Sequence, residues 1–216
     1  MTLPASASGP AAARAESYLA EDDEIASARG RGRSAGAEPV TAATGAALTL
    51  LAAAVSARAV VEIGTGAGVS GLYLLRGMAV DGALTSIDVD PELQRAARAS
   101  FLAAGTGPSR LRLINGMALE VLPRLTDGGY DLIVADAVPA EYPGYLAEAV
   151  RLLRPGGMLV LHGVVHGDGH GADAAAGQEG PGPAALRETV DLVRDDERLV
   201  SALLPVADGM LCAVRR

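Results

Sequence analysis

From residue 59 onward, short aliphatic and β-branched runs alternate along the chain with longer segments in which apolar residues recur at helical spacing. Short apolar runs of this kind predict buried strands, and their alternation with helices predicts right-handed βαβ units around a parallel sheet. The predicted strands are 59–63, 83–88, 110–114, 130–135 and 158–161. The predicted helices are 69–77, 90–104, 117–125, 142–153 and 184–194.

The end of the chain follows a different pattern. Two apolar runs, 199–206 and 210–214, flank the tripeptide Ala207-Asp208-Gly209. Asp-Gly is a strong signal for the tight turn of a β-hairpin. The sequence therefore predicts an α/β fold with a doubly wound, Rossmann-like and mostly parallel sheet of seven strands, the five above and a C-terminal antiparallel hairpin of two.

The N-terminal part is helical in pattern. Residues 1–14 are rich in Ala, Ser, Pro and Gly, and we predict a disordered tail because they offer few large apolar groups to bury. Residues 15–33 carry acids near the start and arginines near the end, which predicts a helix. The uncharged segment 40–57 just reaches the length of a membrane span, but its threonines and alanines are weakly apolar, so we interpret it as a helix packed in protein.

These features predict a single domain, 15–216, that begins with N-terminal helices over 15–57. The segment 166–183, rich in Gly, Ala and Pro, is predicted to be a mobile surface loop. We expect the alanine-rich N-terminal helices to form a homodimer surface. The start of the chain does not resemble a secretory signal, so we expect a cytoplasmic protein.

Charge and composition narrow the range of partners. The chain has 26 acidic and 18 basic residues, and all of the bases are arginine. An excess of acid gives little attraction for a phosphate backbone, so neither nucleic acid nor a membrane is an expected partner. Chemistry that requires a lysine is excluded, and the one cysteine, Cys212, cannot form an internal disulfide.

A glycine-rich loop, Gly64-Thr65-Gly66-Ala67-Gly68, follows the first predicted strand directly. Open α/β sheets bind ligands at this place, and glycines let the backbone approach them closely. A dinucleotide fingerprint requires a glycine where this chain has Val69, and no Gly-Lys-Ser/Thr follows for a nucleoside triphosphate. An NAD-dependent reductase is therefore a weak alternative.

Two acids near this loop indicate what it binds. Asp88 ends the second strand, where a carboxylate can accept hydrogen bonds from ribose hydroxyls. Glu62 comes just before the glycines and suits a cationic ligand. The alternative is that the loop is an ordinary tight turn and Asp88 a surface acid.

The order of these motifs along nearly the whole chain resembles the cation-dependent O-methyltransferase family, which contains catechol and caffeoyl-coenzyme A O-methyltransferases, and is most similar to its branch of small actinobacterial proteins. Besides the acidic N-terminal helix, the motifs that carry the resemblance are Glu38-Pro39-Val40-Thr41, Val61-Glu62-Ile63-Gly64-Thr65-Gly66, Thr85-Ser86-Ile87-Asp88-Val89-Asp90, Tyr130-Asp131-Leu132-Ile133-Val134-Ala135-Asp136 and Leu152-Leu153-Arg154-Pro155-Gly156-Gly157. The resemblance implies S-adenosylmethionine (SAM) as cofactor. The pocket residues that it implies are Val40, Glu62, Gly64, Thr65, Gly66, Ser70, Asp88 and Val89, with Asp136 and Val138 beside the transferred methyl group.

The chain departs from the family where the family binds a divalent cation. In the family, the fourth strand ends in an acid that binds Mg²⁺, and a lysine three residues later is the candidate base; this chain has Asp136 and Pro139 there. The two further ligands of the family, Asp-Asn after the fifth strand, are replaced by His162 and Gly163. One carboxylate and one imidazole make a poor Mg²⁺ site, so a divalent cation is doubtful and we predict no metal ligand.

The three histidines, His162, His166 and His170, recur at spacings of four. On a helix they would share one face and, with Asp136, could bind a softer metal such as Zn²⁺. The glycines between them disfavour a helix, so we expect only His162, at the end of the fifth strand, to lie next to Asp136.

The expected function is SAM-dependent methyl transfer to a hydroxyl, phenolic in the favoured interpretation, of a small-molecule acceptor. We expect Asp136 to bind and orient the acceptor hydroxyl and His162 to accept its proton. Alternatively His162 is a satisfied core residue, and Tyr142 and Tyr145 either border the acceptor or simply pack. The alternative function is a SAM-binding protein whose catalytic site has eroded.

Overall fold

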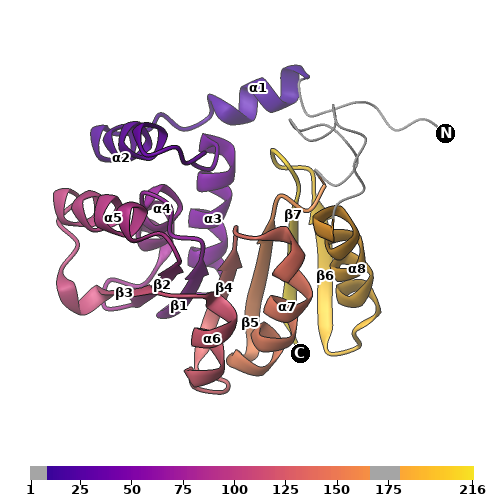
Figure 1. Cartoon of the computed structure of the whole chain (residues 1–216). Helices are drawn as coiled ribbons and strands as arrows, with labels where there is room; N and C mark the ends of the chain where they lie inside the picture. Colours follow the sequence, from indigo (N-terminus) through magenta and orange to yellow (C-terminus); the bar gives the residue numbers. More distant parts are fainter. Residues whose placement is uncertain (1–8, 166–180) are drawn as a thin grey trace.

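A computed structural model describes residues 9–165 and 181–216, which form one twisted sheet with helices on both faces (Figure 1). The strands are β1 (Ala59–Ile63), β2 (Ala83–Asp88), β3 (Leu111–Asn115), β4 (Tyr130–Ala135), β5 (Leu153–His162), β6 (Leu199–Leu204) and β7 (Met210–Arg215). Their order in the sheet is β3-β2-β1-β4-β5-β7-β6. Strands β1 to β5 are parallel, and β7 is antiparallel to both β5 and β6. The predicted fold class is confirmed.

Each face of the sheet carries its own apolar core. The first core lies against α2 (Asp23–Ser34), α3 (Ala42–Ala54), α4 (Val69–Gly77) and α5 (Pro91–Ala103), and the second against α6 (Ala118–Val121), α7 (Tyr142–Leu152) and α8 (Pro181–Asp195). Along β4, Leu132 and Val134 belong to the first core, whereas Ile133 and Ala135 belong to the second. Because β4 is buried on both faces, its residues 132–135 form a continuous hydrophobic run.

The N-terminal helices differ from the prediction. Residues Pro10–Glu16 form a helix, α1, where a disordered tail was expected up to residue 14; its alanines are strong helix formers, and Pro10 suits the first turn. The predicted helix 15–33 is wrong at its start. Helix α2 begins at Asp23 because the Asp22 side chain caps it, with Oδ1 3.1 Å from the backbone nitrogen of Ile25. Residues 1–8 lie outside the described part of the chain.

Helix α3 packs closely on α4. Thr41 caps its start by accepting a hydrogen bond from the backbone N–H of Thr44. A Cβ added at Gly45 would lie 2.2 Å from the ring of Tyr73, so only glycine permits this approach. Over the residues that the structure describes, no helix combines the length and the apolar character needed to cross a membrane.

The C-terminal hairpin closes the sheet beside the end of β5. The backbone N–H of Gly163 donates to the carbonyl of Gly209 in the hairpin turn, at 2.9 Å. Helix α8 begins at residue 181, earlier than the predicted 184, so the predicted loop 166–183 is too long at its end. Residues 166–180 lie outside the described residues.

Candidate active site

A cavity of about 340 Å³ opens at the carboxyl ends of β1, β2 and β4. Strands β1 and β4 are neighbours in the sheet, and the chain order reverses between them, which is the place where doubly wound sheets bind ligands. The lining residues are Ala37, Glu38, Pro39, Val40, Gly64, Thr65, Gly66, Ala67, Val69, Ser70, Asp88, Val89, Leu93, Asp136, Ala137 and Val138. All of the predicted site residues except Glu62 and His162 therefore line one cavity.

Gly64, the first residue of the glycine loop, lies between the end of β2 and the end of β4. Gly64 has a φ of 94°, and a Cβ added there would lie 2.0 Å from the backbone oxygen of Asp136. Its N–H donates to the carbonyl of Ile87, and the N–H of Asp136 donates to the carbonyl of Ile63, both at 2.9 Å. Glycine at position 64 is thus required by both conformation and space.

Asp88 fixes the loop from the end of β2. Its Oδ2 accepts a hydrogen bond from the backbone N–H of Gly66, and its Oδ1 accepts one from the N–H of Asp90, both at 2.9 Å. The residue also lines the cavity. A carboxylate held by backbone donors keeps free lone pairs in a fixed direction, so Asp88 can accept further hydrogen bonds from hydroxyls of a ligand.

Glu62 lies behind the loop. Its carboxylate is 1% exposed and accepts hydrogen bonds from the hydroxyls of Ser70, at 2.7 Å, and Ser86. Burial raises the pKa of Glu62 to about 7, although these two hydrogen bonds act in the opposite direction. Glu62 therefore supports Ser70, which lines the cavity, but does not line it itself.

Asp136 and His162 form a pair at the ends of β4 and β5. Nδ1 of His162 lies 3.1 Å from Oδ1 of Asp136, and Nε2 lies 3.4 Å from Oγ1 of the buried Thr44. Burial lowers the pKa of His162, but the hydrogen bond and negative charge of Asp136, with a contribution from Asp208, outweigh burial and raise it. Tyr142 donates a hydrogen bond to the His162 carbonyl at 2.7 Å. The imidazole is thus fixed on both sides, and Asp136 lines the cavity whereas His162 does not.

The residues at the family's cation positions do not fit Mg²⁺. They supply one carboxylate from Asp136, one imidazole from His162 and no side-chain donor from Gly163, whereas Mg²⁺ prefers octahedral oxygen coordination. The imidazole and the carboxylate are also hydrogen-bonded to each other. Within 9–165 and 181–216, no group of three or more His, Cys, Asp or Glu side chains could hold a metal ion. His166 and His170 lie outside these ranges, so the zinc alternative concerns undescribed residues.

Sequence reasoning missed the part of the cavity wall formed by residues 37–39. Glu38 and Pro39 belong to a motif that carries the family resemblance, but only Val40 of that motif was expected in the pocket, and no local pattern shows that residues 37–39 line it. Tyr142 and Tyr145 are both 2% exposed, with ring centroids 5.7 Å apart, and neither lines the cavity. In the structure these two tyrosines are packing residues.

The comparisons with known proteins agree with this geometry. A family model described as O-methyltransferase matches residues 17–216. The chain belongs to the O-methyltransferase family. A relative of this methyltransferase in Mycobacteroides abscessus, provisionally described as an O-methyltransferase, is 51% identical over 201 residues, which are 93% of this chain and 92% of the relative. The family expected from the sequence is confirmed.

Solved structures share the fold of this methyltransferase. A protein from Corynebacterium glutamicum is 32% identical and has a TM-score of 0.83, with 93% of each chain covered. TomG from Streptomyces achromogenes, an O-methyltransferase involved in tomaymycin synthesis, was crystallised with SAM; it is 27% identical, with a TM-score of 0.83 and 95% of each chain covered.

Proposed function

We propose that this methyltransferase transfers the methyl group of SAM to a hydroxyl, phenolic in the favoured case, of a small-molecule acceptor. One observation carries the proposal: the glycine loop, Asp88 and Asp136 line a single cavity at the switch point of a sheet that belongs to an O-methyltransferase. The SAM bound to TomG supports the choice of cofactor.

We assign the two sides of the cavity to the two reactants. Asp88 accepts hydrogen bonds from the ribose hydroxyls, and the backbone of Gly64–Gly68 approaches the amino-acid part of SAM. Val89 and Val138, which are 62% and 51% exposed, offer apolar surface at the cavity to the flat parts of the ligands. Asp136 lies on the opposite side of the loop and faces the acceptor.

Methyl transfer is an in-line displacement in which the acceptor oxygen forms a bond to the methyl carbon as the bond from that carbon to sulfur breaks. The chain mainly has to align the two atoms and to take the proton of the acceptor hydroxyl. In our proposal, Asp136 accepts the hydrogen bond of that hydroxyl. Asp136 also takes the proton of that hydroxyl, because the contact of His162 with this carboxylate requires the proton on Nδ1 and the His162 ring does not line the cavity. His162 then acts by orienting the Asp136 carboxylate, and not as the proton acceptor expected from the sequence.

The test is calorimetric titration of chelator-treated protein with SAM, followed by assays of phenolic acceptors with and without Mg²⁺. We expect SAM to bind and methyl transfer to proceed equally well in both conditions, since the residues present do not fit Mg²⁺. The His162→Ala variant is expected to bind SAM like the wild type and to lose most of the transfer. Absence of SAM binding would overturn the cofactor assignment, and strict dependence on Mg²⁺ would overturn the role of the Asp136–His162 pair.

A second candidate function is binding of SAM without turnover. It is favoured by Pro139 and Gly163, which replace the family's lysine and one of its cation ligands. The acceptor assay separates the two, because a binding protein retains affinity for SAM and forms no methylated product from any acceptor. The homodimer and the cytoplasmic location stay predictions from the sequence.

A further inference from the structure

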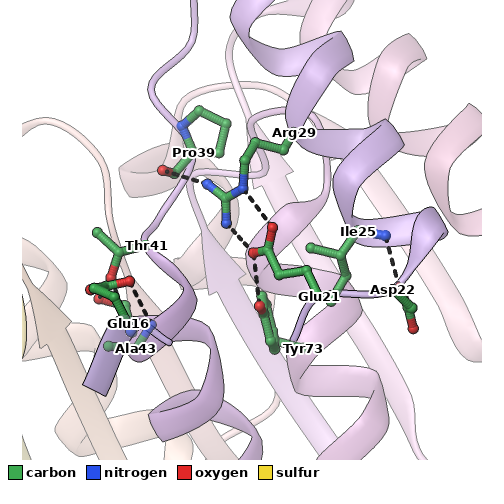
Figure 2. Close-up of polar contacts among 10 residues, drawn as sticks. Glu16, Glu21, Asp22, Ile25, Arg29, Pro39, Thr41, Ala43 and Tyr73 are labelled. Carbon is green, nitrogen blue, oxygen red and sulfur yellow. Dashed lines mark hydrogen bonds and ion pairs between the residues drawn. The ribbon is translucent and has the colours of Figure 1, made fainter. Parts of the chain in front are cut away.

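The part of the cavity wall formed by residues 37–40, of which only Val40 was predicted, contacts α2. Figure 2 shows the guanidinium of Arg29 between the carbonyl of Pro39 and the carboxylate of Glu21. Nη1 donates to the Pro39 oxygen at 3.3 Å, while Nε and Nη2 both donate to Glu21, the former at 3.0 Å. The planar guanidinium of Arg29 thus joins the cavity wall at Pro39 to Glu21, just before α2.

The carboxylate of Glu21 is also held by a residue of α4. The hydroxyl of Tyr73 donates to Oε1 of Glu21 at 2.8 Å, on the side opposite the guanidinium (Figure 2). The side chains of Arg29 and Glu21 are only 13% and 18% exposed, so the pair is largely shielded from solvent. A partly buried bidentate pair with a further neutral donor is geometrically specific, because Oε1 of Glu21 accepts from both Nη2 of Arg29 and the Tyr73 hydroxyl while Oε2 accepts from Nε of Arg29.

Helix α2 also packs on the glycine loop. A Cβ added at Gly32 would lie 3.0 Å from Cγ of Pro39 and 3.2 Å from Cβ of Ala67. Nε of Arg31 donates to Oγ of Ser100, which in turn donates to the carbonyl of Ala67 at 2.8 Å. Pro39 and Ala67 both line the cavity, so one helix contacts two parts of its wall.

We propose that Arg29 is a positioning residue for the cofactor: by holding the Pro39 carbonyl, it fixes the wall 37–40 against the glycine loop and so sets the affinity and residence time of SAM. This inference rests on the proposed function, since it takes SAM as the occupant of the cavity. Lysine cannot replace Arg29, because one ammonium cannot present three donors in a plane to Pro39 and Glu21 together.

The test compares Arg29→Lys with Arg76→Lys in the full chain. Arg76 also joins α4 to α2, through an ion pair with Asp22, but its side chain contacts no residue of the wall among the hydrogen bonds of the described residues. Both substitutions keep the charge and are expected to lower the melting temperature of the cofactor-free protein by a few degrees. Titration with SAM and stopped-flow dissociation of SAM are then measured for each variant.

We expect the Kd of Arg29→Lys for SAM to rise about tenfold, mostly through faster dissociation, and that of Arg76→Lys to stay within about twofold of the wild type. An unchanged Kd for Arg29→Lys, or equal losses in the two variants, would overturn the positioning role and leave the cofactor assignment intact. If the wild type did not bind SAM, the proposed function itself would fail. If Arg29→Lys did not fold, Tyr73→Phe would take its place in the comparison, with an expected rise in Kd of about threefold.

Discussion

The two sides of the cavity are held by different kinds of contact. On the cofactor side, backbone N–H groups of the glycine loop are the donors: the N–H of Gly64 donates to the carbonyl of Ile87, and that of Gly66 donates to the carboxylate of Asp88. On the acceptor side, Asp136 is held by a side-chain contact with His162. The close approach of Gly64 to the Asp136 backbone permits only glycine at that position, whereas the contact of the Asp136 carboxylate depends on which side chain stands at position 162. The first contact therefore constrains the chain itself, and the second constrains one pair of side chains.

The largest expected effect comes from adding a side chain at Gly64, where the glycine loop contacts the backbone after β4. Gly64→Ala places a Cβ 2.0 Å from the backbone oxygen of Asp136 at a φ of 94°, and we expect a loss of about 3 kcal/mol or more in the free energy of unfolding. Urea titration measures it. Gly66→Ala is the matched control, because its φ is 49° and no heavy atom lies within 4 Å of the added Cβ. It should cost only about 1 kcal/mol, and equal losses would contradict the close contact.

The next effect concerns Glu62, the buried carboxylate that bonds to Ser70 on the cofactor side of the cavity. Because the pKa of Glu62 is raised from 4.5 to about 7, the folded state holds this proton more tightly than the unfolded state does. Stability from this group is therefore greatest below pH 4.5, falls as the pH rises toward about 7 and is then constant. We expect the difference in unfolding free energy between wild type and Glu62→Gln to change over this range by up to about 3 kcal/mol. Parallel pH profiles would show that Glu62 titrates normally.

A smaller effect is expected on ligand affinity at the cofactor side. Asp88→Asn removes a charged acceptor from the cavity and should raise the Kd for SAM by roughly tenfold or more. The control is Asp90→Asn, which keeps a side chain able to cap α5 and does not line the cavity. Calorimetric titration of both variants checks the prediction, and a similar Kd in the two would remove Asp88 from the ribose site.

The smallest effect is expected on the acceptor side. Thr44→Val removes the buried hydroxyl that lies 3.4 Å from Nε2 of His162 while preserving shape, and should cost about 1 kcal/mol. In a His162→Gln background the same substitution should cost less, because the partner of the hydroxyl is already changed. Unfolding of the four proteins in urea gives this double-mutant cycle. Equal costs in both backgrounds would mean that the hydroxyl and the imidazole do not interact.

The centre of the sheet was predictable from sequence because β1 and β4 are buried on both faces and leave short, mainly apolar runs. The hairpin of β6 and β7 was predictable from its Asp208-Gly209 turn. The start of α2 at Asp23 was not predictable. It depends on one capping side chain, Asp22, and each of the neighbouring acids could have capped a helix equally well by sequence. The orientation of Glu62 was predictable in principle. Val60 faces the core against α2 to α5, and residues two apart on a strand share a face, so the Glu62 side chain points beneath α4 and not along the strand into the cavity.

Val40 was predicted from the resemblance, but the rest of the wall, residues 37–39, and its contact with Arg29 could not be predicted. The contact joins Arg29 in helix α2 to Pro39 in the irregular connection after it, ten positions along the chain, where no periodicity specifies which groups meet. The pairing of Asp136 with His162 was predicted, because adjacent parallel strands end at the same edge of the sheet. Burial of His162 was one of two alternatives left open by the sequence, and its contact with Thr44 of α3 was not predicted, since the two residues are 118 positions apart.

The contact between Gly64 and Asp136 has a consequence for how the two motifs change among related sequences. Since the oxygen that excludes a Cβ at position 64 belongs to the backbone, no substitution of the Asp136 side chain can make room for one. A relative with a larger residue at position 64 must therefore also have a different course of the chain after β4. We expect insertions or deletions after this strand to co-vary with loss of the glycine, whatever residue occupies the acidic position.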